Sequence, residues 1–309
     1  MTLLQRYLLT VAVFFTLDLN AQSLDEELLF RDVEVLSSDS MEGRKSGTAG
    51  ADMAADYIIQ RMKRIGVSPY KNEDYFHHFP YVLRRGKKIL GKNIVSFIPG
   101  TSGKEEYIIF TAHYDHLGKA GFEIYNGADD NASGVAVLLA LMTYFKTHPP
   151  VHHLIFIATD AEEQGLLGIK AFAKDHGRLM KQTLLNINMD MLSRATESPT
   201  LFAVGTYQYP ALKNLIEEGP TPSLFTLVFG HDTPRDKGKD NWLNASDHGT
   251  FYQRDIPFLY FGVEDHKDYH ETTDTYEKID KVFYKEVARY LLDLAAYLDQ
   301  QMQAVSLVK

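Results

Sequence analysis

Histidine and acidic residues gather in short stretches that each follow an apolar run suited to a buried strand. Four such stretches are His113-Tyr114-Asp115-His116, Asp160-Ala161-Glu162-Glu163, Met189-Asp190-Met191 and Asp268-Tyr269-His270. A fifth, GADDNASG at 127–134, precedes a predicted helix. One such stretch alone is typical of a solvated surface, but imidazole and carboxylate groups together bind divalent ions such as zinc. Their recurrence after several strands therefore indicates a metal centre.

The apolar runs before these stretches predict the strands that would position them. Strands are predicted at 93–97, 107–111, 153–159, 184–188 and 257–261. Helices are predicted at 51–65, 135–145 and 280–301, where apolar residues recur every three or four positions. Strands that alternate with helices favour an α/β domain around a largely parallel sheet. Ligands of such sheets bind beyond the carboxyl ends of the strands, so the polar stretches should meet at one edge.

The amino-acid composition excludes several classes of protein and several kinds of active site. The chain has 309 residues, of which 45% are hydrophobic and 24% charged, as in ordinary globular proteins. Lysine and arginine number 32 against 41 acidic residues, and the net charge of −9 disfavours nucleic acid as a partner. The absence of cysteine excludes thiol nucleophiles, disulfides and cysteine zinc sites.

Residues 1–21 have the three-part pattern of a secretory signal peptide. Arg6 provides the positive region, residues 7–17 form an apolar run, and Ala21 ends the segment. Asp18 stops the run well short of the roughly 20 apolar residues of a membrane span. We expect an exported protein, periplasmic or secreted, without a stable membrane anchor. Residues 22–309 should then form one catalytic domain.

Several familiar catalytic motifs are missing from the sequence. There is no GxSxG nucleophile elbow, no GxxxxGK[ST] phosphate loop, no GxGxxG dinucleotide fingerprint and no HExxH zinc motif. What remains is a cluster rich in carboxylates and histidine. A pair of metal ions about 3.5–4 Å apart needs a bridging carboxylate, terminal carboxylates and a histidine for each ion. This sequence offers such a set.

Six ordered segments resemble the co-catalytic zinc aminopeptidases of peptidase family M28. They are AHYDHLG at 112–118, GADDNASG at 127–134, AEEQGLLG at 161–168, NMDML at 188–192, SDHGTF at 246–251 and YHETTDT at 269–275. Residues 41–44 also resemble a family stretch, so the resemblance covers about 34–285. It implies a doubly wound, mostly parallel mixed sheet flanked by helices.

The resemblance also implies a set of ligands for two zinc ions per chain. His113 and Asp190 would bind one zinc, and Glu163 and His270 would bind the other. Asp130, which stands directly before an asparagine, would bridge the two ions.

Three further residues acquire catalytic roles from the resemblance. Glu162 would be the general base, which takes a proton from the metal-bridging water and passes it to the leaving amine. Asp115 would orient the His113 imidazole through its second ring nitrogen. Tyr269 would donate a hydrogen bond to the oxyanion.

Other polar residues in these segments have more ordinary interpretations. Asp129 is expected to cap the following helix, and Asp274 to fix the loop in which it lies. His116 fits a hydrogen-bonded loop histidine as well as a site residue. Asp247 and His248 fit either the wall of the site or ordinary packing.

The expected activity is hydrolysis of the N-terminal peptide bond of peptides with a free N-terminus, by a hydroxide that bridges two zinc ions. One alternative is a glutaminyl cyclase-like acyltransferase, which has this fold and uses a single zinc. Another is a metal-free binding module, but such relatives usually lack a ligand, and none is missing here. The sequence carries no prediction of the oligomeric state.

Overall fold

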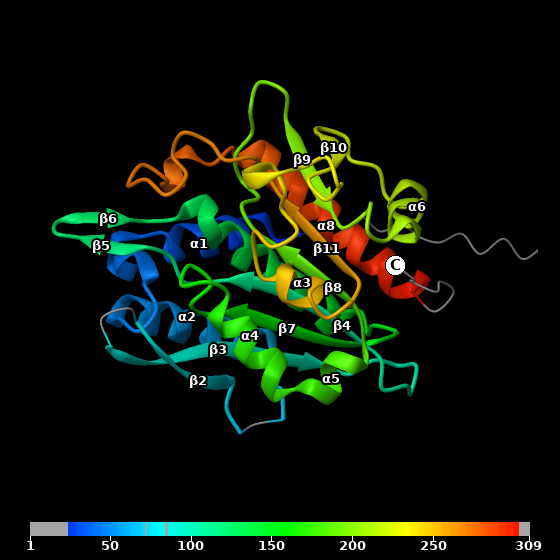
Figure 1. The fold of residues 1–309 in the computed structure, drawn as a ribbon, viewed down its shortest axis with the longest axis horizontal. Helices are drawn as coiled ribbons and strands as arrows, with labels where there is room; N and C mark the ends of the chain where they lie inside the picture. Colours follow the sequence, from blue (N-terminus) through cyan, green and yellow to red (C-terminus); the bar gives the residue numbers. More distant parts are fainter. Residues whose placement is uncertain (1–23, 72, 84–85, 303–309) are drawn as a thin grey trace, which may run out of the picture.

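The computed structural model describes residues 24–71, 73–83 and 86–302, and the predicted signal peptide lies outside this part. A mixed sheet of nine strands runs through the molecule between two layers of helices (Figure 1). The order along the sheet is β1-β3-β7-β4-β8-β11-β9-β10, with β2 paired to β3. The strands are β1 Ser68–Pro69, β2 Phe76–Val82, β3 Lys88–Ile98, β4 Tyr107–His113, β7 His153–Thr159, β8 Thr183–Met189, β9 Thr200–Val204, β10 Thr226–Phe229 and β11 Phe258–Gly262.

The centre of the sheet is parallel and its flanks are largely antiparallel. Strand β4 pairs in parallel with β7 and β8, and β8 pairs in parallel with β11. Strand β3 runs antiparallel to β7, β9 runs antiparallel to β11, and the edge strand β10 is parallel to β9. Because the four central strands share one direction, their carboxyl ends meet at one edge of the sheet.

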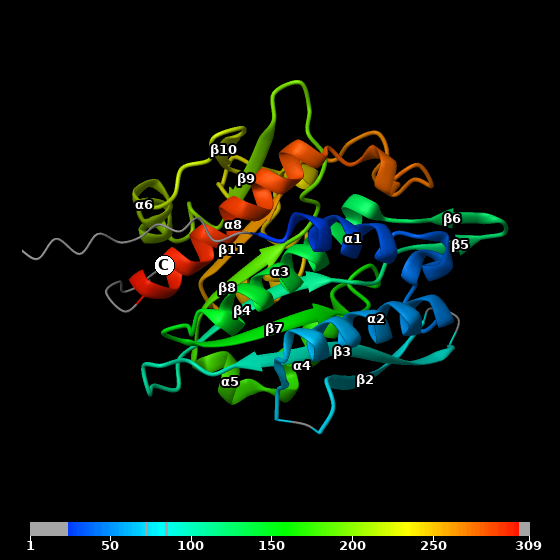
Figure 2. The same ribbon diagram turned by 180° about the vertical axis from the view of Figure 1, so that it is seen from behind.

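Helices cover both faces of the sheet. Figure 2 shows α1, α2, α3 and α8 on one face, and Figure 1 shows α4, α5 and α7 on the other. The helices are α1 Glu26–Leu36, α2 Ala49–Ile65, α3 Gly134–Thr147, α4 Leu167–Asp175, α5 Gly177–Lys181, α6 Pro210–Glu218, α7 His248–Tyr252 and α8 Lys281–Gln301. This arrangement confirms the expected mixed α/β sheet flanked by helices.

Local sequence signals explain where the long helices begin and end. Asp25 caps α1 by accepting a hydrogen bond from the backbone of Leu28, and Asp280 caps α8 in the same way. Helix α2 ends at Gly66, whose left-handed backbone (φ 80°) is one that glycine adopts without strain. All three predicted helices are present within two residues of their predicted bounds.

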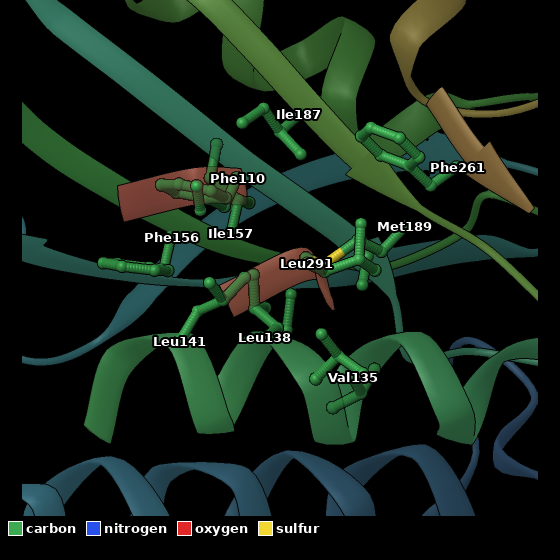
Figure 3. Close-up of a cluster of buried hydrophobic side chains, with 14 of the residues drawn as sticks. Phe110, Val135, Leu138, Leu141, Phe156, Ile157, Ile187, Met189, Phe261 and Leu291 are labelled. Atoms are coloured by element: carbon green, nitrogen blue, oxygen red, sulfur yellow. The ribbon is translucent and has the colours of Figure 1, made fainter. Parts of the chain in front are cut away.

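The core lies between the sheet and α3. Val135, Leu138 and Leu141 of this helix are buried near side chains of β4, β7 and β8 (Figure 3). The rings of Phe110 and Phe156 stack on neighbouring strands with centroids 5.0 Å apart. Each fully buried side chain of this size contributes about 1.5–3 kcal/mol, so the core holds the parallel strands in a fixed register.

Some elements were not predicted. They include α1, α4, β2, β9 and β10, and a two-stranded hairpin of β5 Gly118–Ala120 and β6 Glu123–Tyr125 that extends from the body beside α1 (Figure 1). Among the described residues, no helix is both long and apolar enough to span a membrane.

Candidate metal centre

The predicted metal ligands come together at the carboxyl edge of the central strands. His113 is the last residue of β4, and Asp190 follows β8 directly. Glu163 lies in the loop after β7, Asp130 in the segment before α3, and His270 in the loop after β11. The loops turn sharply here, because Ala161, Met191 and His270 all have positive φ angles, of 56°, 60° and 57°. Such angles are uncommon for residues other than glycine and often occur at functional sites.

The first set of donor atoms surrounds the imidazole of His113. Its Nε2 lies 3.1 Å from Oδ1 of Asp190 and 3.2 Å from Oδ1 of Asp130. All three residues are buried, and their donor atoms lie within 4.8 Å of one another. They come from three segments that are far apart in the sequence.

The second set lies on the other side of Asp130. Oδ2 of this carboxylate is 3.2 Å from Nε2 of His270, which also lies 3.5 Å from Oε2 of Glu163. A third imidazole, that of His116, lies in the same set: its Nδ1 is 3.6 Å from Oδ2 of Asp130 and 2.9 Å from Oε1 of Glu163. The two oxygens of Asp130 therefore face two different groups of donors.

The spacing of these atoms fits zinc. Zinc–ligand bonds of about 2.0–2.2 Å at tetrahedral angles place the donor atoms about 3.3–3.6 Å apart. The contacts of His113 and His270 with the carboxylates, 3.1–3.5 Å, are close to this spacing. The donors are imidazole and carboxylate groups, which suit zinc.

The charge of the cluster also fits a cation. Burial lowers the pKa of His270, but hydrogen bonds to Asp130 and Glu163 outweigh it and raise that pKa to about 10. Burial also lowers the pKa of His113, but the negative charges of Asp190 and Glu162 outweigh this effect and raise that pKa well above the usual value. Without metal, the buried carboxylates thus hold protons on the imidazoles. A divalent ion would take the place of those protons.

Glu162 occupies different surroundings from the predicted ligands. Burial raises the pKa of its carboxyl well above the usual value, and the charges of Asp190 and Asp247 act in the same direction. Its backbone N–H donates to Oδ1 of Asp115 at 3.0 Å. The side chain of Glu162 lines a cavity beside the metal ligands.

The contacts of Asp115 differ from those expected. Nδ1 of His113 donates its hydrogen bond to the backbone carbonyl of Asp115, at 3.0 Å, while Oδ1 of the carboxylate lies 3.9 Å away. The carboxylate instead accepts from the backbone of Glu162. Asp115 therefore fixes both the ring of one predicted ligand and the loop that carries the predicted base.

The expectation that Asp129 caps a helix is wrong. Its Oδ1 accepts from the backbone and hydroxyl of Ser193, and its Oδ2 lies 3.0 Å from Nε2 of His266. The amide oxygen of Asn131 accepts instead from the N–H of Gly134, the first residue of α3. Asp129 points away from the helix because these long-range partners satisfy its carboxylate.

Asp274 holds the bridging segment in place. Its carboxylate accepts hydrogen bonds from the backbone N–H groups of Asp129 and Asp130, at 3.0–3.2 Å. The carboxylate therefore acts on the segment that carries the predicted bridge, whereas its role in its own loop stays a prediction. This contact could not be predicted from the sequence, because 144 positions separate Asp130 from Asp274.

Asp247 and His248 pack behind the site. Oδ2 of Asp247 accepts from the hydroxyl of Thr159, and Nε2 of His248 lies 2.7 Å from the carbonyl of Trp242. Burial lowers the pKa of His248 to about 4, so its ring is neutral near pH 7. Of the two interpretations that the sequence left open, packing is the one that these contacts support.

A cavity of about 190 Å³ opens onto the metal ligands. Its lining includes the apolar or aromatic residues Met191, Trp242, Tyr260 and Val263. It also includes the predicted ligands, Glu162, Lys239 and Asp265, together with Tyr269, whose ring stacks on that of His270 with centroids 3.9 Å apart. The cavity therefore offers apolar contacts beside a set of charged groups, as small-molecule sites commonly do.

Comparison with known proteins places the chain among peptidases. The profile of peptidase family M28 matches residues 93–295. The alkaline phosphatase isozyme conversion protein of Escherichia coli K12 is 30% identical over 166 residues, which cover 48% of this chain and 47% of that protein. Aminopeptidase YwaD of Bacillus subtilis is 28% identical over 199 residues, covering 62% of this chain and 41% of that protein. The chain thus spans less than half the length of either relative.

Solved structures share the fold. A zinc aminopeptidase from Bacillus subtilis superposes with a TM-score of 0.67 at 17% identity, over 88% of this chain and 95% of that chain. A glutaminyl cyclase from Fimbriiglobus ruber gives a TM-score of 0.72 at 18% identity, over 89% and 95%. Because both activities occur on this fold, the fold alone does not choose between them. The family profile, which spans most of the sheet and every predicted ligand, does establish the family: the chain belongs to peptidase family M28, a family of zinc-dependent peptidases.

Proposed function

We propose that this protein is a two-zinc aminopeptidase that removes residues from the free N-terminus of peptides. The observation that carries the proposal is the position of Asp130. Its Oδ1 lies 3.2 Å from Nε2 of His113 and its Oδ2 lies 3.2 Å from Nε2 of His270. A carboxylate that faces one histidine with each oxygen is the bridge that a pair of metal ions requires.

Five side chains would hold the two ions. His113 and Asp190 would bind the first ion, Glu163 and His270 the second, and Asp130 both. Zinc bound there would supply an electrophile for the scissile carbonyl and a water molecule that ionises near neutral pH. Residues that line the cavity would transfer the proton and stabilise the negative charge that develops on the substrate.

Glu162 is the residue placed to move the proton. It lines the cavity but is not one of the donors that surround Asp130. As general base it takes the proton of the attacking water and delivers it to the leaving amine. Burial and the neighbouring carboxylates raise its pKa, which helps the carboxyl to hold the proton between these two steps.

Tyr269 is placed to stabilise the negative charge that develops on the carbonyl oxygen. Burial raises the pKa of its hydroxyl well above the usual value, and the charges of Asp130 and Asp190 add to this effect. The hydroxyl therefore stays protonated and can donate a hydrogen bond to the oxyanion. Asp265 and Lys239 also line the cavity, and the carboxylate of Asp265 can pair with a positively charged α-amino group.

The proposal is tested with three substrates on the zinc-loaded protein. Leucylglycine has an apolar first side chain, which suits the apolar lining residues of the cavity. N-acetyl-leucylglycine lacks the free amine, and a peptide with N-terminal glutamine reports cyclisation. We expect hydrolysis of the first, at least about 100-fold slower hydrolysis of the second, and no cyclisation of the third. Cyclisation without hydrolysis would support the cyclase alternative, and binding without turnover would support the binding module.

We further propose that the protein is exported and acts in the periplasm or outside the cell as a single catalytic domain of residues 22–309. The support is the pattern of residues 1–21: a positive residue, an apolar run and a small residue at the end. N-terminal sequencing of protein recovered from the periplasm or medium should give a chain that begins close to Gln22. Recovery from the cytoplasm with residues 1–21 intact would contradict export.

A further inference from the structure

His116 is buried in an arrangement that its protein neighbours do not explain. The side chain is inaccessible to solvent, and neither ring nitrogen makes a hydrogen bond of regular geometry to the described residues, although Nδ1 lies 2.9 Å from Oε1 of Glu163. A buried polar group without a partner destabilises the folded protein, because it has lost its hydrogen bonds to water. Native structures therefore seldom leave such a group unpaired unless an ion or water satisfies it.

A second unpaired atom faces the same point. Oε1 of Glu163 is also buried without a hydrogen bond from the described residues, and it lies 2.9 Å from Nδ1 of His116. At this distance the two atoms would form a hydrogen bond if the N–H pointed at the oxygen. The contact does not have that geometry, and Oδ2 of Asp130 lies 3.6 Å from the same nitrogen, so the three atoms are close enough together to share one metal ion.

The ring of His116 is held in this position. Its backbone N–H donates to the carbonyl of Arg44, and its ring meets that of His270 edge to face with centroids 5.9 Å apart. On another side lies Gly127, where an added Cβ would come within 2.7 Å of the imidazole. Gly127 has a positive φ of 58°, which glycine adopts without strain, and its lack of a side chain lets the imidazole of His116 lie against the backbone.

We propose that Nδ1 of His116 is a direct ligand of the metal ion that Asp130, Glu163 and His270 hold. This inference rests on the proposed two-zinc site and adds a ligand to it. The second ion then has four protein donors, two of them imidazoles, whereas the first has three donors and one imidazole. Four-coordinate sites closed by protein ligands hold zinc firmly, and sites with three protein ligands keep a position open. Of the two ions, the first would then have more positions left for water or substrate than the second.

The alternative role for His116 is to position Glu163 through a hydrogen bond. The orientation of the ring argues against it, because the 2.9 Å contact lacks hydrogen-bond geometry. The two roles also differ in a measurable way. A ligand contributes its imidazole to the metal's coordination shell, and a positioning residue does not.

X-ray absorption of the cobalt-loaded wild-type protein counts those imidazoles directly. The proposal predicts three imidazoles for two bound ions, from His113, His116 and His270, and two imidazoles for two ions in His116→Gln. Two imidazoles for two ions in both proteins would overturn the proposal. Because the wild-type count decides by itself, the test does not depend on whether the variant folds.

Metal affinity gives an independent readout. Competition with a zinc chelator should show that His116→Gln binds one of its two zinc ions at least about 100-fold more weakly, with the other unchanged. His152→Gln is the matched control, since His152 is equally buried but contacts Asp299 and stands directly before β7, at the opposite end of that strand from Glu163. Unchanged affinity for both ions in His116→Gln would contradict the proposal.

The same experiments separate failure of the inference from failure of the proposed function. A wild-type protein that binds a single zinc would contradict the two-zinc proposal. The imidazole count of that one ion in His113→Gln, which removes the imidazole of the first site, would still test His116: two imidazoles support it as a ligand, and one imidazole refutes it.

Discussion

Glu162 and Glu163 are adjacent in the chain but have different partners. Glu163 lies against two imidazoles and Asp130, whereas the side chain of Glu162 lines the cavity. The positive φ of Ala161 turns the loop just before the pair, so consecutive side chains point to different places. One carboxylate is thus available for the metal and the other for proton transfer.

This division predicts different outcomes for two matched substitutions. Glu162→Gln should lower kcat by about 10²–10⁴-fold, as expected for a lost general base, while the zinc content stays at the wild-type level. Glu163→Gln should lower the zinc content itself, because it removes a charged ligand. The measurements are steady-state kinetics and elemental analysis on the same preparations. Near wild-type turnover in Glu162→Gln would exclude it as the base.

For single residues, the sequence predicted which side chains could bind metal, but it did not predict all of their contacts in the fold. His113, Asp130, Glu163, Asp190 and His270 are the predicted ligands, and the structure brings them together. Their type and their place after strands were sufficient signals. The surroundings of His116 and Asp129 were not predictable in this way, because they depend on contacts across the fold, such as that between Asp129 and His266.

At the scale of elements, a buried arginine ties the short helical segment Asp39–Arg44 to the loops around the site. The guanidinium of Arg44 donates to the backbone carbonyls of Leu36, Tyr114, Asn126 and Gly127, at 2.6–2.9 Å. Burial lowers its pKa to about 10, which still leaves it charged at neutral pH. It therefore connects the end of α1 with the segments on both sides of the β5–β6 hairpin.

Arg44→Met should destabilise the protein by about 3–5 kcal/mol, because it leaves several buried carbonyls without a donor. Lys45→Met is the matched control: Lys45 is exposed and makes one long contact of 3.3 Å, so its loss should change stability by less than about 0.5 kcal/mol. Urea unfolding of both variants measures the difference. Equal stability of the two variants would show that the Arg44 network does not hold the segment.

Periodicity was most informative for the long or fully buried elements. Strand β7 begins and ends at the predicted residues, and β4 and β8 extend the predictions by one or two residues. The elements that were missed are short, such as β5 and β10, or exposed along one side, such as β2. The shortest of these segments carry too few apolar positions to show a period of their own. Strand β2 does alternate in burial, but histidines and Pro80 interrupt its apolar pattern, so its pairing is set by neighbours in the fold.

At the scale of the whole molecule, the fold converts distant sequence positions into one site. The segments that carry His113 and His270 are 157 positions apart, yet both side chains contact the carboxylate of Asp130. The parallel strands place their carboxyl ends side by side, and the helices on both faces keep the sheet rigid (Figures 1 and 2). The predicted order of strands and helices was sufficient to predict the edge of the sheet at which the ligands meet. The distances between the ligand atoms could be obtained only from the structure.

The number of zinc ions per chain tests the central claim most directly. The mature protein should be purified without chelator, exposed to excess zinc, exchanged into metal-free buffer and analysed for metal and protein content. The account predicts close to two zinc ions per chain, and close to one in Asp190→Ala, which lacks a ligand of the first ion only. One zinc or less in the wild-type protein would contradict the bridging role of Asp130 and with it the two-zinc mechanism.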